Sequence, residues 1–349
     1  MTHLSDTARQ TPAGALPTSM RAVTRRRYGG PEVVGVETLE RPEPAAGELL
    51  LRVRAAGLDR ATLHLLEGKP YLARLAFGLR RPGRPVLGQQ VAGEVVAVGA
   101  DVSGYAVGDR VFGTADGSFA EYAVAKVSKV AATPDTVRDV DAATLGVSGT
   151  TALDAVNHVE VAAGQTILVH AAAGGVGQLL VQLGKHLGAR VVATAGGPDK
   201  CALAAGLGAD TVIDYRAVDD LAGAIRAATD GQGVDVAYDG VGKDTFEASL
   251  ASLRRRGLLA LYGAASGPVP PLDLQRLNAA GSVFVTRPSL PHHLATREEL
   301  LWRSGELFDW IGQGQLTVAE PTRFGFDEAG AAYAALEGRR TTGKVLLVP

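Results

Sequence analysis

Two hydrophobic patterns divide the chain. Between Met20 and about Thr144, short apolar runs alternate with polar residues and are separated by Gly and Pro, which is typical of antiparallel strands. From about Ser148, apolar runs of strand length alternate with segments in which apolar residues recur at helical spacing. Repeated strand–helix–strand units of this kind predict a parallel sheet with helices on both faces. The sequence therefore predicts two structural units.

The pattern also places individual elements. In the first unit we expect strands at 49–55, 91–98, 110–112 and 120–124. In the second we expect strands at 166–170, 190–194, 211–213, 234–238, 258–262 and 283–286, and helices at 177–187 and 200–207. The tail predicts helices at 298–312 and 328–336 and a closing strand at 344–348. This tail is too short to fold alone, so we expect it to return to the first unit or to bridge the two.

Composition narrows the class of protein. The 349 residues are 46% hydrophobic and carry a net charge of −2, which gives no general attraction to nucleic acid or anionic membranes. A single cysteine, Cys201, cannot form an internal disulfide. Residues 1–19 are polar, and no run of about 18 apolar residues follows. We expect a cytoplasmic enzyme with a disordered extension over residues 1–19 and no nucleic-acid or membrane partner.

The segment Gly164–Lys185, GQTILVHAAAGGVGQLLVQLGK, carries the clearest chemical signal. A buried strand runs directly into Ala172–Gly177 and then into a helix, so backbone N–H groups and the positive end of the helix dipole face one point. That arrangement suits a pyrophosphate. Gly174 allows a ligand close to the backbone, and Gly177 allows the helix to pack close to the strand. The segment predicts a dinucleotide site.

The end of the second parallel strand favours NADPH over NADH. NAD-binding sites usually place Asp or Glu about 20 residues after the glycines, where it binds the ribose hydroxyls. Here the chain has Thr194-Ala195-Gly196-Gly197, with Lys200, Tyr215 and Arg216 close in sequence. These side chains can meet a 2′-phosphate, although an ordinary solvated surface position is an equal alternative for Arg216.

The same segment resembles the zinc-free quinone oxidoreductases, including the zeta-crystallin type, of the medium-chain dehydrogenase/reductase family. It matches their signature at every fixed place, and similar stretches run from Val91 to Phe112 and from Gly338 to Pro349. The resemblance implies an α/β protein: a Rossmann doubly wound parallel sheet plus a GroES-like, mostly antiparallel β-barrel catalytic domain, usually as a homodimer. The implied domains are 20–146 and 287–349 for the catalytic part and 147–286 for the Rossmann part.

The resemblance also implies a set of cofactor contacts. They are Thr150, Thr151, Ala173, Gly174, Gly175, Val176, Gly177, Thr194, Lys200, Tyr215, Arg216, Gly263 and Lys344.

No catalytic metal is expected. Zinc-dependent relatives take their ligands from three places that correspond to Asp59, Gln89 and Leu145. Leucine cannot bind zinc, and the remaining two residues are too few for a stable site. Without a Lewis acid, reduction of a simple ketone is difficult, whereas quinones and α,β-unsaturated carbonyls spread the incoming charge.

The loop Gly57–Gly68 corresponds to the family's cleft loop and supplies catalytic candidates. His64 is the leading proton donor because of its near-neutral intrinsic pKa, or else it only lines the pocket. Asp59 either orients His64, binds the nicotinamide ribose or caps a turn. Tyr71 is a candidate for substrate contact, and Gln89 is expected beside the nicotinamide or the substrate. His170 is expected to be a packed core residue.

Together these features predict a zinc-independent, NADPH-dependent oxidoreductase that passes hydride to a quinone or another conjugated carbonyl. The alternative is an enoyl or alkenal reductase, for example in a biosynthetic pathway. An NADPH-binding protein with little turnover and an alcohol dehydrogenase are less favoured. The sequence leaves the acceptor open.

Overall fold

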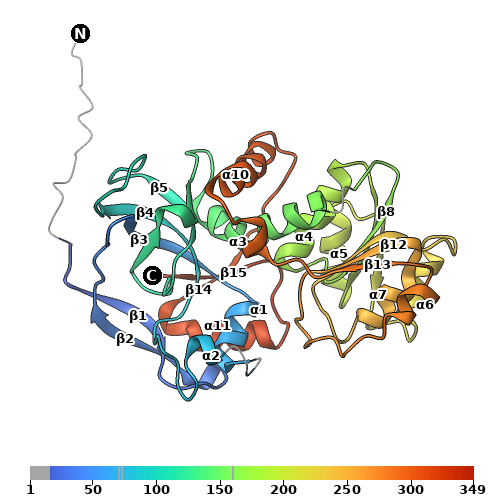
Figure 1. Ribbon diagram of the computed structural model, residues 1–349, viewed down its shortest axis with the longest axis horizontal. Helices are drawn as coiled ribbons and strands as arrows, with labels where there is room; N and C mark the ends of the chain where they lie inside the picture. Colours follow the sequence, from blue (N-terminus) through green and yellow to red (C-terminus); the bar gives the residue numbers. More distant parts are fainter. Residues whose placement is uncertain (1–15, 70, 72–73, 159–160) are drawn as a thin grey trace, which may run out of the picture.

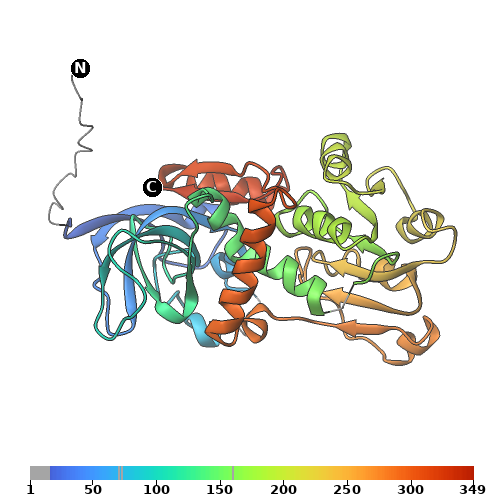
Figure 2. The same cartoon turned by 90° about the horizontal axis from the view of Figure 1, so that it is seen from above.

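Two sheets joined by one long helix make up the molecule (Figures 1 and 2). The computed structural model describes residues 16–69, 71, 74–158 and 161–349, without the side chains of 76 and 156–158. Strand β1 begins at Ser19, and residues 1–15 of the extension that we expected to be disordered lie outside the described residues.

The first sheet is mostly antiparallel. Its strands follow the order β14-β15-β3-β4-β5-β7, with β6 paired to β3, and the described pairings form an open path rather than a closed ring. A separate antiparallel ribbon of β1 and β2 lies beside it. The bounds are β1 Ser19–Arg25, β2 Val34–Glu40, β3 Glu48–Leu58, β4 Gln90–Val98, β5 Arg110–Thr114, β6 Tyr122–Lys126, β7 Val130–Ala132, β14 Thr322–Gly325 and β15 Val345–Val348.

The second sheet is parallel throughout and has the order β10-β9-β8-β11-β12-β13. From β8 the chain adds β9 and β10 on one side and then crosses to add β11, β12 and β13 on the other, so the order of strands reverses between β8 and β11. In doubly wound folds, ligands bind outside the carboxyl ends of the strands at such a point. The bounds are β8 Thr166–Val169, β9 Arg190–Ala195, β10 Thr211–Asp214, β11 Val234–Asp239, β12 Leu253–Leu261 and β13 Phe284–Thr286. The predicted Rossmann sheet is confirmed.

The helices pack on the faces of the sheets and lie between the two large sheets (Figure 1). Their bounds are α1 Arg60–Glu67, α2 Arg74–Phe77, α3 Asp139–His158, α4 Gly175–His186, α5 Pro198–Gly206, α6 Leu221–Ala227, α7 Phe246–Ser252, α8 Gln275–Ala279, α9 Leu290–His293, α10 Arg297–Gly312 and α11 Ala329–Glu337.

Helix α3 was not expected from the sequence pattern. It is apolar on most sides, with Leu145 and Leu153 buried, because it packs against the first sheet on one side and against α4 and α10 on others. A helix buried all round shows no amphipathic period, and Gly146 and Gly149 lower its intrinsic propensity. The boundary that we expected between residues 146 and 147 falls inside this helix.

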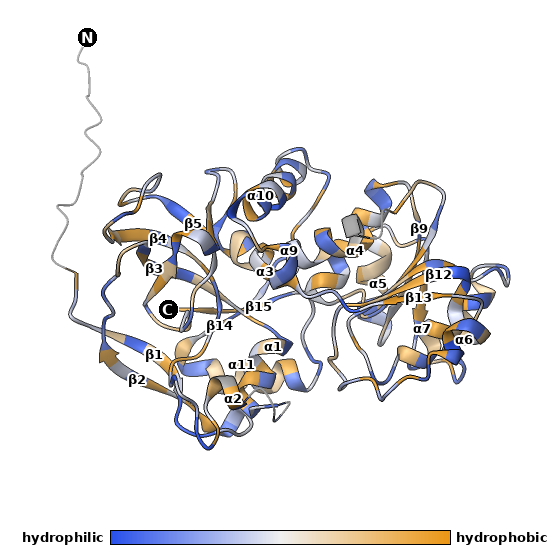
Figure 3. Ribbon diagram, viewed as in Figure 1, coloured by the Kyte–Doolittle hydropathy of each residue, from blue (hydrophilic) through white to orange (hydrophobic). Residues whose placement is uncertain are grey.

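The tail returns to the first sheet. Strand β15 pairs antiparallel with β3 and parallel with β14, while α10 packs on α3. The apolar cluster around α3 combines Phe112 of β5 and Phe308 of α10 with Ile167 of the parallel sheet, and the two phenylalanine rings meet edge to face with centroids 5.0 Å apart. Figure 3 shows the apolar strands at the centre of each sheet. Within the described ranges, no helix has the length and apolar character to cross a membrane.

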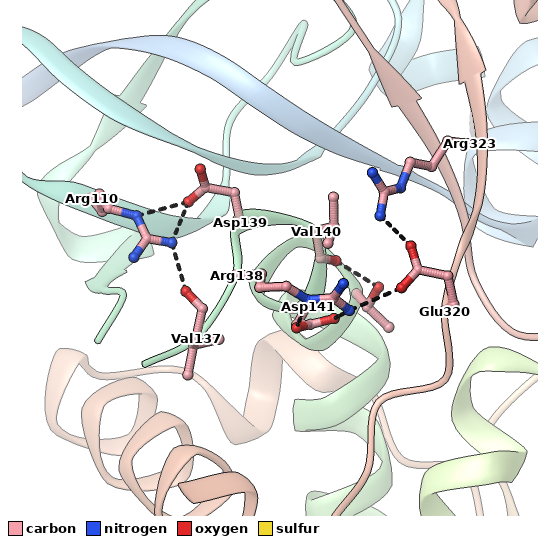
Figure 4. A network of polar contacts seen from close by, with 9 residues as sticks. Arg110, Val137, Arg138, Asp139, Val140, Asp141, Glu320 and Arg323 are labelled. Atoms are coloured by element: carbon pink, nitrogen blue, oxygen red, sulfur yellow. Dashed lines mark hydrogen bonds and ion pairs between the residues drawn. The ribbon is translucent and has the colours of Figure 1, made fainter. Parts of the chain in front are cut away.

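Ion pairs fix the start of α3 (Figure 4). Arg110 of β5 donates to Asp139 at 2.7 Å and to the carbonyl of Val137 at 2.6 Å. Arg138 reaches Glu320 at 3.0 Å, and Glu320 also pairs with Arg323 of β14. The same short segment is thereby tied to a strand of the first sheet and to the returning tail.

Candidate functional site

The glycine loop lies between β8 and α4, at the reversal point of the parallel sheet. A Cβ on Gly177 would contact the carbonyl oxygen of Ala171 and lie 2.8 Å from Ala172 Cα, so only glycine fits there. Ala171 itself has a left-handed φ of 51°. Gly174 precedes α4 and has no side chain to cap the helix, so the first-turn amides face the loop.

The returning tail supports this loop from the other side. The N–H of Gly343 donates to the carbonyl of Ala173 at 2.8 Å, and Gly174 and Gly343 form a parallel bridge. The side chain of Gln178 donates to the same Ala173 carbonyl at 3.0 Å. Ala173, Gly174, Gly175, Val176 and Gly177 are therefore held in one strand–loop–helix turn, as the sequence predicts.

Lys344 places a buried cation beside the loop. Its side chain is 3% exposed, and its Nζ donates to Gln90 Oε1 at 2.7 Å and lies 3.8 Å from Asp59 Oδ2. Gln90 also donates to Asp59. Burial lowers the pKa of Lys344, against the opposing attraction of Asp59. The same side chain lies within 3.7 Å of a Cβ built on Gly175, so it flanks the glycine loop.

A cluster of cations gathers beyond the end of β9. Lys200 donates to the carbonyl of Arg339 at 2.7 Å. The pKa of Lys200 is lowered, first by partial burial and then by the positive charges of Arg216, Arg339 and Arg60. Arg339 has one carboxylate nearby, Asp244 at 3.7 Å. Like charges held together in this way favour an anion between them.

Tyr215 and Asp214 shape the floor of this cation cluster. A Cβ on Gly196 would contact the Tyr215 hydroxyl, so the ring lies against the glycine backbone. The carboxylate of Asp214 accepts from Gly197 N and Arg216 N, each at 3.0 Å, and these bonds lower the pKa of Asp214. Asp214 is the last residue of β10, whereas NAD-binding sites carry their ribose-binding carboxylate at the end of the second strand, here β9. The Asp214 carboxylate is bound by two backbone N–H groups.

Other candidates are placed as follows. Thr150 is buried and donates to Gly146 O at 2.9 Å within α3. Thr194 is also buried, with its hydroxyl 2.9 Å from Nδ1 of His170, which is a core residue as predicted. Gly263 directly follows Tyr262, and a Cβ there would contact the Gly240 backbone. The side chains of Thr150 and Thr194 thus have internal partners.

A cavity of about 470 Å³ opens at the same end of the parallel sheet. It is lined by Thr151 and Asp154 of α3, by Tyr262, and by residues 287–290, including Arg287. This volume falls in the range of small-ligand sites. Burial raises the pKa of Tyr262 and lowers that of Arg287. The cavity therefore has a neutral phenol and a guanidinium on its walls.

The catalytic candidates Asp59, His64 and Tyr71 are not among the residues that line this cavity. Asp59 caps α1 by accepting from Thr62 N at 2.9 Å, which is the turn-capping alternative. Among the described residues its other polar partners are Gln90 and Lys344. His64 lines a separate cavity of only about 10 Å³ with Tyr28, and Tyr71 is 69% exposed.

Sequence reasoning missed several residues that the fold brings to the site. Gln90, adjacent to the predicted Gln89, makes the contacts with Lys344, while Gln89 contributes its carbonyl to Ala115 N. Arg60 and Arg339 join the cation cluster from positions distant in sequence. Gln90 is the first residue of β4 and Gln89 directly precedes the strand, so the exact start of β4 was the signal that could have separated the two.

Comparison with known proteins defines the class. Residues 175–297 match the family model "Zinc-binding dehydrogenase", and residues 45–135 match "Alcohol dehydrogenase GroES-like domain". The fold, the glycine loop and these matches define a medium-chain dehydrogenase/reductase.

Relatives that align over nearly their whole length identify the family within this class. A quinone oxidoreductase of Pseudomonas aeruginosa is 39% identical over 92% of this chain and 97% of its own, and a 2-haloacrylate reductase of a Burkholderia species is 35% identical over 95% and 99%. A mycobacterial structure in complex with NADPH superimposes with a TM-score of 0.87 at 44% identity, covering 95% of this chain and 100% of its own. The Escherichia coli quinone oxidoreductase complexed with NADPH gives 0.88 at 34%, covering 94% and 100%. The chain belongs to the quinone oxidoreductase family.

The residues do not fit the zinc that the name of the matching model implies. Leu145 is fully buried hydrocarbon, and Asp59 is engaged by Thr62, Gln90 and the Lys344 ammonium. Across the described part of the chain, no three His, Cys, Asp or Glu side chains are grouped to hold a metal ion.

Proposed function

We propose that the protein is a zinc-independent, NADPH-dependent oxidoreductase that reduces a quinone or another conjugated carbonyl. The observation that carries the proposal is the alignment of three features along the carboxyl edge of one parallel sheet. These are the cation cluster, the glycine loop and the 470 Å³ cavity.

The described residues fit NADPH. The glycine loop would hold the pyrophosphate, and Lys344 adds a positive charge beside it. The loop is closely packed, because a Cβ on Gly177 would contact its backbone. Lys200, Arg216, Arg339 and Tyr215 would hold the 2′-phosphate. Bound NADPH supplies a hydride. Thr151 lines the cavity and Gly263 directly follows Tyr262, which also lines it, so these two residues would flank the nicotinamide and the cavity would receive the acceptor.

Relatives support this assignment and its alternative. The names of the Pseudomonas aeruginosa and Escherichia coli relatives state quinone oxidoreductase activity, and the latter structure contains NADPH. The name of the Burkholderia relative states reduction of a 2-haloacrylate, an α,β-unsaturated acid, which supports enone or alkenal C=C reduction as the second candidate.

Three further features belong to the proposal. The catalytic domain would comprise 20–146 and 287–349 and the Rossmann domain 147–286, with α3 crossing the division. A homodimer is supported by β13, which ends the parallel sheet and carries Phe284 at 60% exposure. The balanced charge of −2 and the single cysteine support a cytoplasmic protein without a nucleic-acid partner.

The test is NADPH oxidation by the purified, EDTA-treated protein. The acceptors are 1,4-benzoquinone, 9,10-phenanthrenequinone, an enone, an enal and a simple ketone, each repeated with NADH. Quinone turnover that prefers NADPH is expected. Turnover of the enone or enal alone would move the protein to the C=C reductases. NADPH binding without any turnover, or ketone reduction that zinc restores, would contradict the proposal.

A further inference from the structure

A carboxylate, an imidazole and a guanidinium meet behind the acceptor cavity. Asp154 of α3 lines the cavity, and its side chain is 5% exposed. Its Oδ1 lies 2.8 Å from Nδ1 of His293 at the end of α9 and 3.4 Å from Nη2 of Arg303 in α10. Three separate elements thus converge on one carboxylate, and α9 and α10 both pack on α3 (Figure 3).

We propose that Asp154 and His293 form the proton-delivery pair for the reduced acceptor. This inference rests on the proposed function, because hydride addition to a quinone or enone leaves an anion that needs a proton. Asp154 is the member that faces the cavity, whereas His293 is 21% exposed and can exchange with solvent. The pair therefore connects the cavity to water through one 2.8 Å contact.

The proton balance closes within the pair. The N–H bond of the His293 imidazolium breaks as the Asp154 carboxylate takes its proton, and the new O–H bond of Asp154 breaks as the acceptor gains an O–H or C–H bond. His293 regains a proton from solvent. The only co-reactant is NADPH, which supplies the hydride.

The surrounding charges suit this role. Arg303 stabilises the carboxylate that forms when Asp154 gives up its proton. On the cavity side, Arg287 attracts the negative charge that hydride brings to the acceptor, and Tyr262 is a neutral donor because burial raises its pKa. The groups that face Asp154 or its cavity are thus His293 of α9, Arg303 of α10, Arg287 after β13 and Tyr262 after β12.

The experiment compares His293→Gln and Asp154→Asn with His292→Gln. His292 is the exposed neighbour in the same helix and serves as the matched control. Each protein is assayed for NADPH affinity by fluorescence, for kcat across pH, and for the solvent deuterium isotope effect on kcat.

We expect His293→Gln and Asp154→Asn to lower kcat by about 10²-fold, in the range for general acid catalysis. NADPH affinity should stay within about twofold, and the solvent isotope effect should rise, because proton transfer becomes slower than the other steps. The decline of wild-type kcat at alkaline pH should disappear in His293→Gln. The double variant should be no slower than the slower single variant, since the two residues act as a unit.

Two results would overturn the inference in distinguishable ways. If His293→Gln keeps the wild-type pH profile and turnover, the proton comes from another source and the proposed function stands. If wild type and His292→Gln both bind NADPH but reduce no quinone or enone, the proposed function fails and the proton-delivery role fails with it. Should Asp154→Asn not fold, His293→Gln alone decides.

Discussion

The ammonium of Lys344 lies 3.8 Å from the carboxylate of Asp59, although one residue precedes β15 and the other caps α1. Burial nevertheless lowers the pKa of Lys344, so the cost of desolvating the charge exceeds the attraction. A buried charge kept at such a cost beside the glycine loop is consistent with a role in binding an anion.

Replacing Lys344 by Met tests that role. The variant leaves Gln90 Oε1 without its donor and Asp59 without its cation, so the free energy of unfolding should fall by about 1–3 kcal/mol. NADPH affinity should fall about tenfold, because a charge-assisted contact to phosphate is lost. Chemical denaturation and fluorescence titration measure the two quantities, and a large loss of stability with unchanged affinity would contradict this expectation.

A pair of glycine substitutions should have opposite effects. Gly177→Ala forces a methyl group against the Ala171 carbonyl and should destabilise the protein by about 1–3 kcal/mol and abolish tight NADPH binding. Gly305→Ala, inside α10 with nothing within 4 Å of the new Cβ, should stabilise it by about 0.5–1 kcal/mol. Thermal unfolding with and without NADPH is the measurement. Equal effects of the two changes would show that the loop tolerates a side chain.

Lys200→Met should separate the two nicotinamide cofactors. The Lys200 ammonium belongs to the cation cluster with Arg216 and Arg339, so its loss should weaken NADPH about tenfold and leave NADH unchanged. Dissociation constants for both cofactors check this, with Lys126→Met, an exposed lysine on β6, as the charge-matched control. Equal weakening of both cofactors would place the 2′-phosphate elsewhere.

His170 should make stability depend on pH. Complete burial lowers its pKa, with Asp239 opposing the shift, so the folded protein binds fewer protons than the unfolded chain below the ordinary value of 6.5. The free energy of unfolding should therefore fall as the pH drops through that window, by up to about 1.4 kcal/mol per pH unit. Denaturation of wild type, His170→Gln and His292→Gln at several pH values tests this. The slope should shrink only in His170→Gln.

His64→Gln should have little effect on turnover. The cavity that His64 lines, about 10 Å³, is too small for an acceptor. We expect kcat within about threefold of wild type, because uncharged glutamine can still line that space. A hundredfold loss of kcat with unchanged NADPH affinity would instead support His64 as the proton donor that the cleft-loop resemblance suggests.

Local sequence signals predicted the parallel sheet well and the 470 Å³ cavity poorly. The strand, glycine loop and helix at 166–186 are continuous in sequence, so their mutual placement follows from local geometry. Asp154, Tyr262 and Arg287 share one cavity only because α3, β12 and the segment after β13 pack together. The hydrophobic pattern of each segment predicts its own secondary structure but not which other segments it packs against.

The same limit explains Gln89 and Gln90. The alignment with the zinc-ligand positions drew attention to Gln89, but β4 begins at Gln90, and it is the pairing of this strand with β5 that brings Gln90 to Lys344. Arg60 and Arg339 likewise meet Lys200 only after the tail has returned to the first sheet.

That return has a consequence for synthesis. The amide of Gly343 and the ammonium of Lys344 support the glycine loop, yet a ribosome adds them about 10–30 s after Gly177 at ~5–20 residues per second. The Rossmann strands can pair during that interval without these two supports. We therefore expect tight NADPH binding only once the tail is complete, so that a partly made protein does not sequester the cofactor.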